Sequence, residues 1–288
     1  MIIDGGSTGA VTISADANGA TFSRPVSSPT ITGSQQIDAT TEWGQRIKFA
    51  NAIITHRPTY LSQRALGTMA APSTVTLGTI IGGIEAGAFN GSAYTLGYNG
   101  GAGMLFQADG TWTTSSMPSS ISFYTTAVNA TGYSERMRIS PAGFVTAPSQ
   151  PSFHATRAIG ASPVSLGTDS TVLPFDTVFH NIGGYYNTST YRFTAPIAGR
   201  YLFCSTVRYD SAAAGSYMRL LLSVNGGTET FRYAHSISGS SHSTDYESLS
   251  ISVVINLNAG DYVQVLGGRN GGSSTFQFES QFSGILIG

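Results

Sequence analysis

The stretch that decides the fold is Ser-Leu-Ser-Ile-Ser-Val-Val-Ile-Asn-Leu at residues 248–257. Its apolar residues recur at every second position, and a period of two is typical of an antiparallel strand with one buried face. The next residues, Asn-Ala-Gly-Asp at 258–261, tolerate the backbone angles of a tight turn, and a second apolar run follows at 262–266. The pattern predicts a hairpin with its turn at 258–261.

Two more hairpins are predicted upstream. Aromatic strands at 191–193 and 201–209 flank Ala-Pro-Ile-Ala-Gly-Arg at 195–200, whose proline belongs outside a central strand. Apolar residues at 220–224 precede Asn-Gly-Gly at 225–227, and Asn-Gly between strands is the strongest short-range hairpin signal.

The chain is expected to end in a strand and to contain few helices. Phe276, Phe278 and Phe282 fall on one face of the segment 275–287, opposite polar residues. Charged residues make up only 10% of the chain, and 35 glycines supply many turns. Together these features predict an all-β protein.

Five blocks of the C-terminal half, taken in order, carry a resemblance to a known family: Phe153, Tyr186-Asn187, 193–203, 258–263 and 282–284. In this order and spacing, residues 153–288 resemble the complement-1q-like head, a jelly roll of the tumour-necrosis-factor type. The resemblance implies a jelly-roll β-sandwich that forms a homotrimer and binds a ligand rather than catalysing a reaction. An unrelated β-sandwich is the alternative.

The first half resembles the repeated shaft module of bacteriophage tail fibres and spikes. The resemblance rests on Ile-Ser-Phe-Tyr-Thr-Thr at 121–126, on Glu-Arg-Met-Arg-Ile at 135–139, and on the glycine turn after Pro141. It implies an N-terminal β-module that forms a fibre shaft.

The second of these strands has a physical reading of its own. Met137 and Ile139 alternate with Arg136 and Arg138, which predicts one apolar and one charged face. Three copies around an axis can bury the apolar face. Glu135 is therefore expected to pair with an arginine of a neighbouring chain rather than to act as a catalytic carboxylate.

These patterns predict four segments. Residues 1–40 are expected either to attach to another virion tail or baseplate protein or to be partly disordered. Residues 41–140 are expected to form the shaft-like β-domain, residues 141–152 a proline-rich linker, and residues 153–288 the head.

The charge distribution excludes some partners. The first 150 residues carry seven basic and seven acidic residues, and the remainder seven and eight, so neither half has a field that attracts nucleic acid or anionic lipid. No signal-peptide pattern and no run of 18 apolar residues is present, so neither secretion by a signal peptide nor membrane insertion is expected. The resemblance to tail fibres then implies a virion protein made in the host cytoplasm. Cys204 is the single cysteine, so no disulfide is expected within the chain.

Motifs for catalysis or for metal binding are weak. Gly-Gly-Ser-Thr-Gly at 5–9 matches the nucleophile-elbow spacing, but no apolar strand precedes it and no helix is predicted after it. The five histidines lack zinc spacing, and no calcium-loop pattern occurs. We expect no catalytic residues, no metal and no cofactor.

Strand parity predicts where recognition residues lie. If the last strand ends at the base, beside the linker, then the turns at 195–200, 225–228 and 258–261 are basal. The longer segments 183–190, 210–216, 235–247 and 267–274 are then apical, and loops on a rigid scaffold are where binding residues concentrate. The predicted receptor-binding residues are Tyr185, Tyr186, Asp210, His235, His242, Asp245, Tyr246, Arg269 and Asn270.

The sequence thus predicts a homotrimeric phage tail fibre or receptor-binding protein whose apical head loops attach the virion to a host cell-surface glycan or protein. A structural fibre or decoration protein, in which the jelly roll is a trimerisation cap, is the first alternative. A polysaccharide depolymerase is the second.

Overall fold

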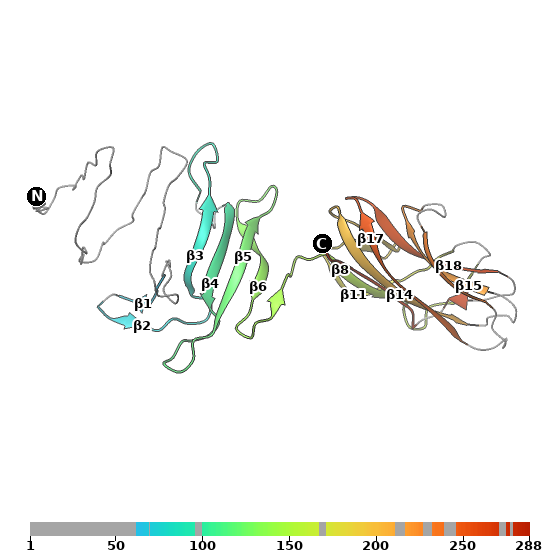
Figure 1. The fold of residues 1–288 in the computed structure, drawn as a ribbon, viewed down its shortest axis with the longest axis horizontal. Helices are drawn as coiled ribbons and strands as arrows, with labels where there is room; N and C mark the ends of the chain where they lie inside the picture. Colours follow the sequence, from blue (N-terminus) through green and yellow to red (C-terminus); the bar gives the residue numbers. More distant parts are fainter. Residues whose placement is uncertain are drawn as a thin grey trace, which may run out of the picture. The chain divides into compact units, whose positions relative to one another are not determined.

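The computed structural model describes residues 62–288, apart from residue 69 and the segments 96–99, 167–170, 211–216, 227–231, 239–245, 271–274 and 277–278. Every regular element in the described residues is a β-strand, so the predicted all-β class is confirmed (Figure 1). The expected attachment segment 1–40 and the Gly-Gly-Ser-Thr-Gly motif at 5–9 lie outside the described residues. The four domain limits stay a prediction.

The N-terminal part of the described chain is an antiparallel meander. After a short pair, β1 (Leu66–Gly67) and β2 (Pro72–Ser73), five strands follow in the order β3-β4-β5-β6-β7. They are β3 (Ile80–Gly87), β4 (Gly101–Ala108), β5 (Ser119–Thr126), β6 (Tyr133–Ile139) and β7 (Val145–Thr146). The turn between β6 and β7 contains Gly143 at φ 82°, a left-handed conformation that glycine adopts without steric strain.

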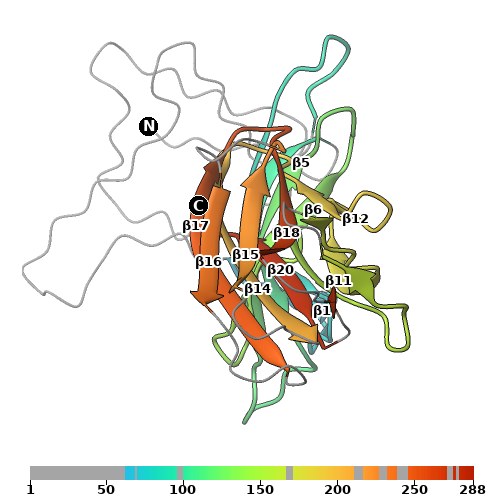
Figure 2. The same ribbon diagram turned by 90° about the vertical axis from the view of Figure 1, so that its right-hand side faces the viewer.

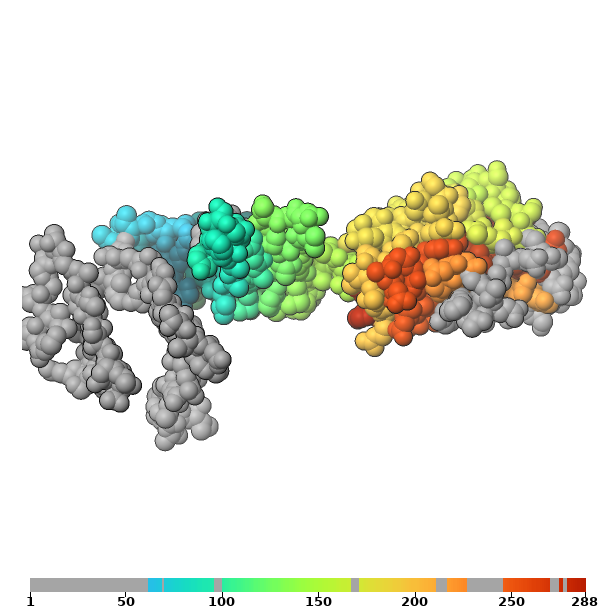
Figure 3. All heavy atoms as spheres, turned by 90° about the horizontal axis from the view of Figure 1, so that it is seen from above, coloured from blue at the N-terminus to red at the C-terminus, as the bar shows by residue number. Residues whose placement is uncertain are grey.

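The C-terminal part is a sandwich of two sheets. The first sheet has the order β11-β8-β20-β14-β19-β9, with β17 on the other side of β14. Its strands are β8 (Ser152–Thr156), β9 (Val164–Ser165), β11 (Thr177–Ile182), β14 (Gly199–Asp210), β17 (Glu247–Leu257), β19 (Thr275–Phe276) and β20 (Gln281–Leu286). On the face drawn in Figure 3, β17 (orange-red) lies along β14 (yellow), with which it pairs over its full length.

The second sheet has the order β12-β13-β18-β15-β16, with β10 paired to β18. Its strands are β10 (Thr171–Val172), β12 (Tyr186–Asn187), β13 (Arg192–Thr194), β15 (Tyr217–Val224), β16 (Arg232–Ser238) and β18 (Tyr262–Asn270). Figure 2 shows β16, β15 and β18 side by side.

Aromatic side chains fill the space between the two sheets. Phe153 stacks on Tyr186 and Phe193, with ring centroids 4.7 and 5.1 Å apart, and meets Phe282 edge-on at 4.8 Å. These side chains are 3% exposed or less. Because Phe153 and Phe282 belong to the first sheet and Tyr186 and Phe193 to the second, this cluster joins the two layers.

The strand at 248–257 is confirmed, but two of the three predicted hairpins are wrong. β17 pairs with β14 and β18 pairs with β13, β15 and β10, so the turn at 258–261 connects the two sheets. The segment 195–200 also connects the two sheets, since β13 and β14 belong to different sheets. The hairpin between β15 and β16 is confirmed, with Tyr217 opposite Ser238. The alternation of apolar and polar residues shows which face of a strand is buried, but it does not show which strand pairs with it.

The predicted final strand is interrupted. Phe276 and Phe282 are fully buried, as the alternation predicts, but they lie on separate strands, β19 and β20. Glu279 between them has φ 66°, a backbone conformation that breaks the pleat. Phe278 lies outside the described residues.

The three predicted basal turns lie together. Asp261 accepts hydrogen bonds from the Asn225 side-chain amide at 2.8 Å and from the Asn258 backbone amide at 2.7 Å. The Ala195 amide donates to the Asp261 carbonyl at 2.8 Å. The chain end is close by, since the Arg200 amide donates to the Gly288 carbonyl at 2.6 Å. The basal placement of these turns is confirmed.

Replacing Phe282 by alanine is expected to lower the free energy of unfolding by about 3–5 kcal/mol, because it removes a fully buried ring from the cluster that joins the sheets. Chemical denaturation followed by circular dichroism measures the effect. The matched control is Phe144→Ala, since that ring is 72% exposed. Equal losses for the two variants would contradict this account of the core.

The basal turns predict a pH dependence. The hydrogen bond from the Asn225 amide, and secondly that from Asn258, lower the pKa of Asp261 below its ordinary value of 3.8. The stability that the carboxylate contributes is therefore complete above pH 3.8 and is lost as the pH falls through the lower folded pKa. Asp261→Asn should be less stable than the wild type at pH 7, and the difference should shrink below pH 3.8. Urea unfolding at pH 7, 5 and 3 tests this; a constant difference would contradict it.

Candidate functional site

The end of the sandwich opposite the basal turns is called the apical end here. There β14 ends at Asp210, β15 begins at Tyr217 and β18 ends at Asn270, while β17 begins at Glu247. Tyr217 is opposite Asn270, and Asp210 is opposite Thr275. The Tyr209 hydroxyl donates to the Arg219 carbonyl at 2.9 Å, which ties the two sheets together near this end.

Four of the predicted binding residues lie at or beside the apical end. Asp210 and Asn270 are the last residues of their strands, Arg269 precedes Asn270, and Tyr246 stands directly before β17. Tyr246 is 67% exposed, so its ring is free to contact a partner. Arg269 is held in place, because its Nε donates to the Leu166 carbonyl at 2.8 Å.

The prediction of an apical position is wrong for Tyr185 and Tyr186. Ile182 is opposite Ser152 at the basal end of the first sheet, so the chain turns there and β12 starts from the base. Tyr186 is 3% exposed, and its hydroxyl donates to the Phe175 carbonyl at 2.9 Å. Burial raises the pKa of Tyr186, which keeps this donor protonated. Tyr185 is half-buried against the same core.

The segment 235–247 was expected to be a loop, and its first part is a strand. His235 lies within β16, opposite Leu220, three residues before the strand ends. His242 and Asp245 lie outside the described residues. Their predicted role in binding stays a prediction.

A charged cluster that the sequence did not reveal is centred on Arg208, beside Tyr246. We call Arg208, Asp210, Tyr246 and Glu279 the apical cluster. The Arg208 guanidinium donates to Asp210 from Nε at 2.8 Å and to Glu279 from Nη1 at 2.5 Å. Its Cζ lies 3.7 Å from the centre of the Tyr246 ring, a cation–π contact.

The electrostatics of the apical cluster favour neutral or cationic ligands. Hydrogen bonds to Asp210 first, and to Glu279 next, raise the pKa of Arg208, so its charge is permanent. One arginine and two carboxylates leave a net charge of −1. The Glu279 side chain is 61% exposed, and a carboxylate beside an aromatic ring can accept hydroxyl hydrogen bonds while the ring stacks on a sugar.

The outer face of the first sheet is a second surface of interest. One row across five strands consists of His180, His154, Ser283, Cys204 and Ser252, each opposite the next.

The next row toward the base includes Ile285, Leu202 and Val254, each opposite the next. Ile285 is 42% exposed and Val254 is 48% exposed, and Phe179, which stacks on His154, is 70% exposed. A shallow cavity of about 290 Å³ lies on this face, between Leu202, Cys204 and Ile285. No described element covers it.

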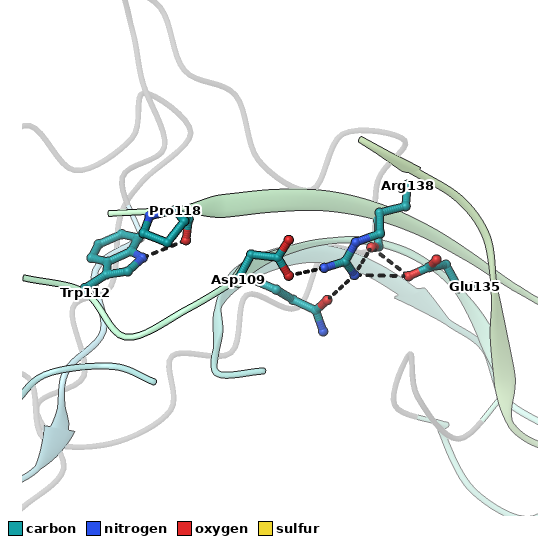
Figure 4. Close-up of polar contacts among 7 residues, drawn as sticks. Asp109, Trp112, Pro118, Glu135 and Arg138 are labelled. Carbon is teal, nitrogen blue, oxygen red and sulfur yellow. Dashed lines mark hydrogen bonds and ion pairs between the residues drawn. The ribbon is translucent and has the colours of Figure 1, made fainter. Parts of the chain in front are cut away.

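The meander has a polar cluster of its own, shown in Figure 4. Arg138 lies between Asp109, to which it forms an ion pair, and Glu135, at 3.4 Å. Ser122 donates to Glu135 at 2.9 Å, and the Trp112 indole donates to the Pro118 carbonyl at 2.9 Å. The expected pairing of Glu135 with a neighbouring chain is corrected, because its arginine partner is in the same chain. Asp109 and Glu135 are both paired with Arg138, so the cluster is suited to holding the strands of the meander together.

Residues 153–287 match the model of the C1q domain family. This match supports the expected C1q-type jelly roll at residues 153–287, and that part of the chain is called the C1q domain below.

The solved structures that match include the globular domain of zebrafish complement 1qA protein, at 18% identity over 48% of this chain and 98% of that chain, with a TM-score of 0.38. The Eiger TNF of S. frugiperda has 16% identity over 48% of this chain and 93% of that chain, with a TM-score of 0.35. No curated protein matches the sequence.

The C1q domain contains no metal cluster among its described residues: no group of three or more His, Cys, Asp and Glu side chains there is arranged to hold an ion. The described part of the chain also has no helix that is long and apolar enough to span a membrane.

Arg208→Met is expected to loosen the apical end of the C1q domain, because Asp210 and Glu279 then face each other without the guanidinium between them. Hydrogen–deuterium exchange should be faster in peptides that contain residues 208–210 and 279–281. Arg200→Met, an exposed position at the base, is the control. Unchanged exchange in the Arg208 variant would contradict the role given to this side chain.

Proposed function

We propose that the protein is a homotrimeric phage tail fibre or receptor-binding protein of the virion, and that the apical end of its C1q domain attaches to a host cell-surface glycan or protein. It acts by binding and not as an enzyme. The single observation that carries the proposal is the exposed Tyr246 ring at the end of a rigid sandwich, in contact with Arg208, which two carboxylates hold in place.

The C1q assignment supports both parts of this function. C1q domains are typically trimeric and mediate binding. The outer face of the first sheet, with Phe179, Val254 and Ile285 exposed, offers the apolar surface that such an assembly would cover. Three apical ends on one axis then bind a repetitive surface by avidity, so that each site can be weak.

The phage context is supported by the shaft-like sequence at 121–126 and 135–139, which occupies strands β5 and β6 of an antiparallel meander. N-terminal residues are assigned to attachment on another tail or baseplate protein.

A depolymerase is disfavoured by the carboxylates of the two clusters. Glycoside cleavage uses a pair of carboxyl groups of which one is free to give a proton. Asp109 with Glu135, and Asp210 with Glu279, each share one arginine instead.

Binding to host cells tests the proposal. The double variant Tyr246→Ala/Asp210→Asn removes the stacking ring and one carboxylate, and we expect the affinity for a susceptible host to fall about tenfold or more, as for the central residues of an interface. Tyr94→Ala is the matched control, since this ring is 84% exposed in the meander.

Wild-type binding by the apical variant would instead favour the structural role, in which the C1q domain serves as a trimerisation cap. Release of reducing ends from purified host polysaccharide by the wild type would favour the depolymerase.

A further inference from the structure

Two adjacent rows of apolar side chains lie on one face of the meander β3–β7. Residues directly opposite on paired strands point to the same side of a sheet. One row across four strands therefore shares a face: Ile84, Met104, Phe123 and Met137. The neighbouring row on that face consists of Phe106, Ile121 and Ile139. We call these two rows the apolar meander face.

A lone sheet in water would expose its polar side chains and bury its apolar ones, and the meander shows the opposite. On the polar side, beside Arg138, Ser122 is fully buried and Leu105 is 4% exposed. On the apolar meander face Ile84 is 67% exposed, and the other six side chains are only half-buried. A shallow groove of about 410 Å³ runs past Ile84, Met104 and Phe123. On the polar side Ser122 is covered by Glu135 and Arg138, which both hydrogen-bond to its hydroxyl, whereas the apolar side lacks a second layer among the described residues.

The charges around this face fit a copy of itself. Its two rows contain no ionisable side chain, and the bulge residue Arg136 at its rim already donates to Thr125 at 3.0 Å and to Ser149 at 3.3 Å. The two rows themselves therefore ask for no complementary charge in an occupant, and an identical apolar face meets that requirement.

The short connection to the C1q domain brings such copies together. β7 ends at Thr146 and β8 begins at Ser152, so five residues join the two parts. Five residues span at most about 18 Å. If the C1q domains form the trimer of the proposed function, three meanders are held at an effective concentration on the order of millimolar.

We propose that the apolar meander faces of three copies of this chain pack against one another around the trimer axis. The meander is thus a second assembly element, with its own apolar core and with its Arg138 cluster facing outward. This inference rests on the proposed trimer and adds a named contact surface to it.

Chemical cross-linking between copies tests the inference. In a Cys204→Ser background of the full chain, Met104→Cys places a thiol in the middle of the apolar meander face. Tyr124→Cys places one on the polar side of the neighbouring strand, since Tyr124 is opposite Gly103. A short bis-maleimide should link Met104→Cys into covalent dimers with at least tenfold higher yield than Tyr124→Cys. The native mass of both samples is measured first.

The outcomes separate the two claims. A trimeric mass with preferential linking through Met104→Cys supports the inference. A trimeric mass without preferential linking through Met104→Cys overturns the inference and leaves the proposed trimer intact. This holds whether the thiol is exposed or is covered by its own chain. A monomeric mass overturns both.

Discussion

The packing of Phe153 between the two sheets is the interaction on which the C1q domain depends. Its ring touches Tyr186 and Phe193 of the second sheet and Phe282 of its own. The approach is close enough that a Cβ at Gly284 would stand 2.7 Å from the ring. Only glycine fits there, and the C-terminal strand can then lie flat over the cluster.

Part of this arrangement could be predicted from the sequence. The alternation at 248–257 defined one strand within a residue of its actual limits, and the Asn-Gly signal identified the hairpin of β15 and β16. The connections at 195–200 and 258–261 were misread as hairpins, because a tight turn joins strands of one sheet or of two with the same residues. Pairing is decided by long-range packing that no local pattern records.

The candidate site was predictable to a similar extent. Strand parity correctly placed Asp210 and Asn270 at the apical end, and it failed for Tyr186, since aromatic residues suit a binding loop and a core equally well. The apical cluster was not predictable. It depends on Glu279, whose positive φ turns its carboxylate toward Arg208, a residue 71 positions away in the chain. The role of the cluster in binding is a proposal that the sequence and the geometry support together.

The two parts of the described chain share one physical constraint, since each leaves an apolar sheet face that nothing in the described residues covers. In the C1q domain this face includes Phe179, Val254 and Ile285, and in the meander it includes Ile84. Assembly of three copies would cover both of these apolar faces. The mass of the 288-residue chain in solution, measured by light scattering across a range of concentrations, tests trimer assembly most directly. The account predicts a stable species of three times 30.1 kDa. A stable monomer of 30.1 kDa would contradict it.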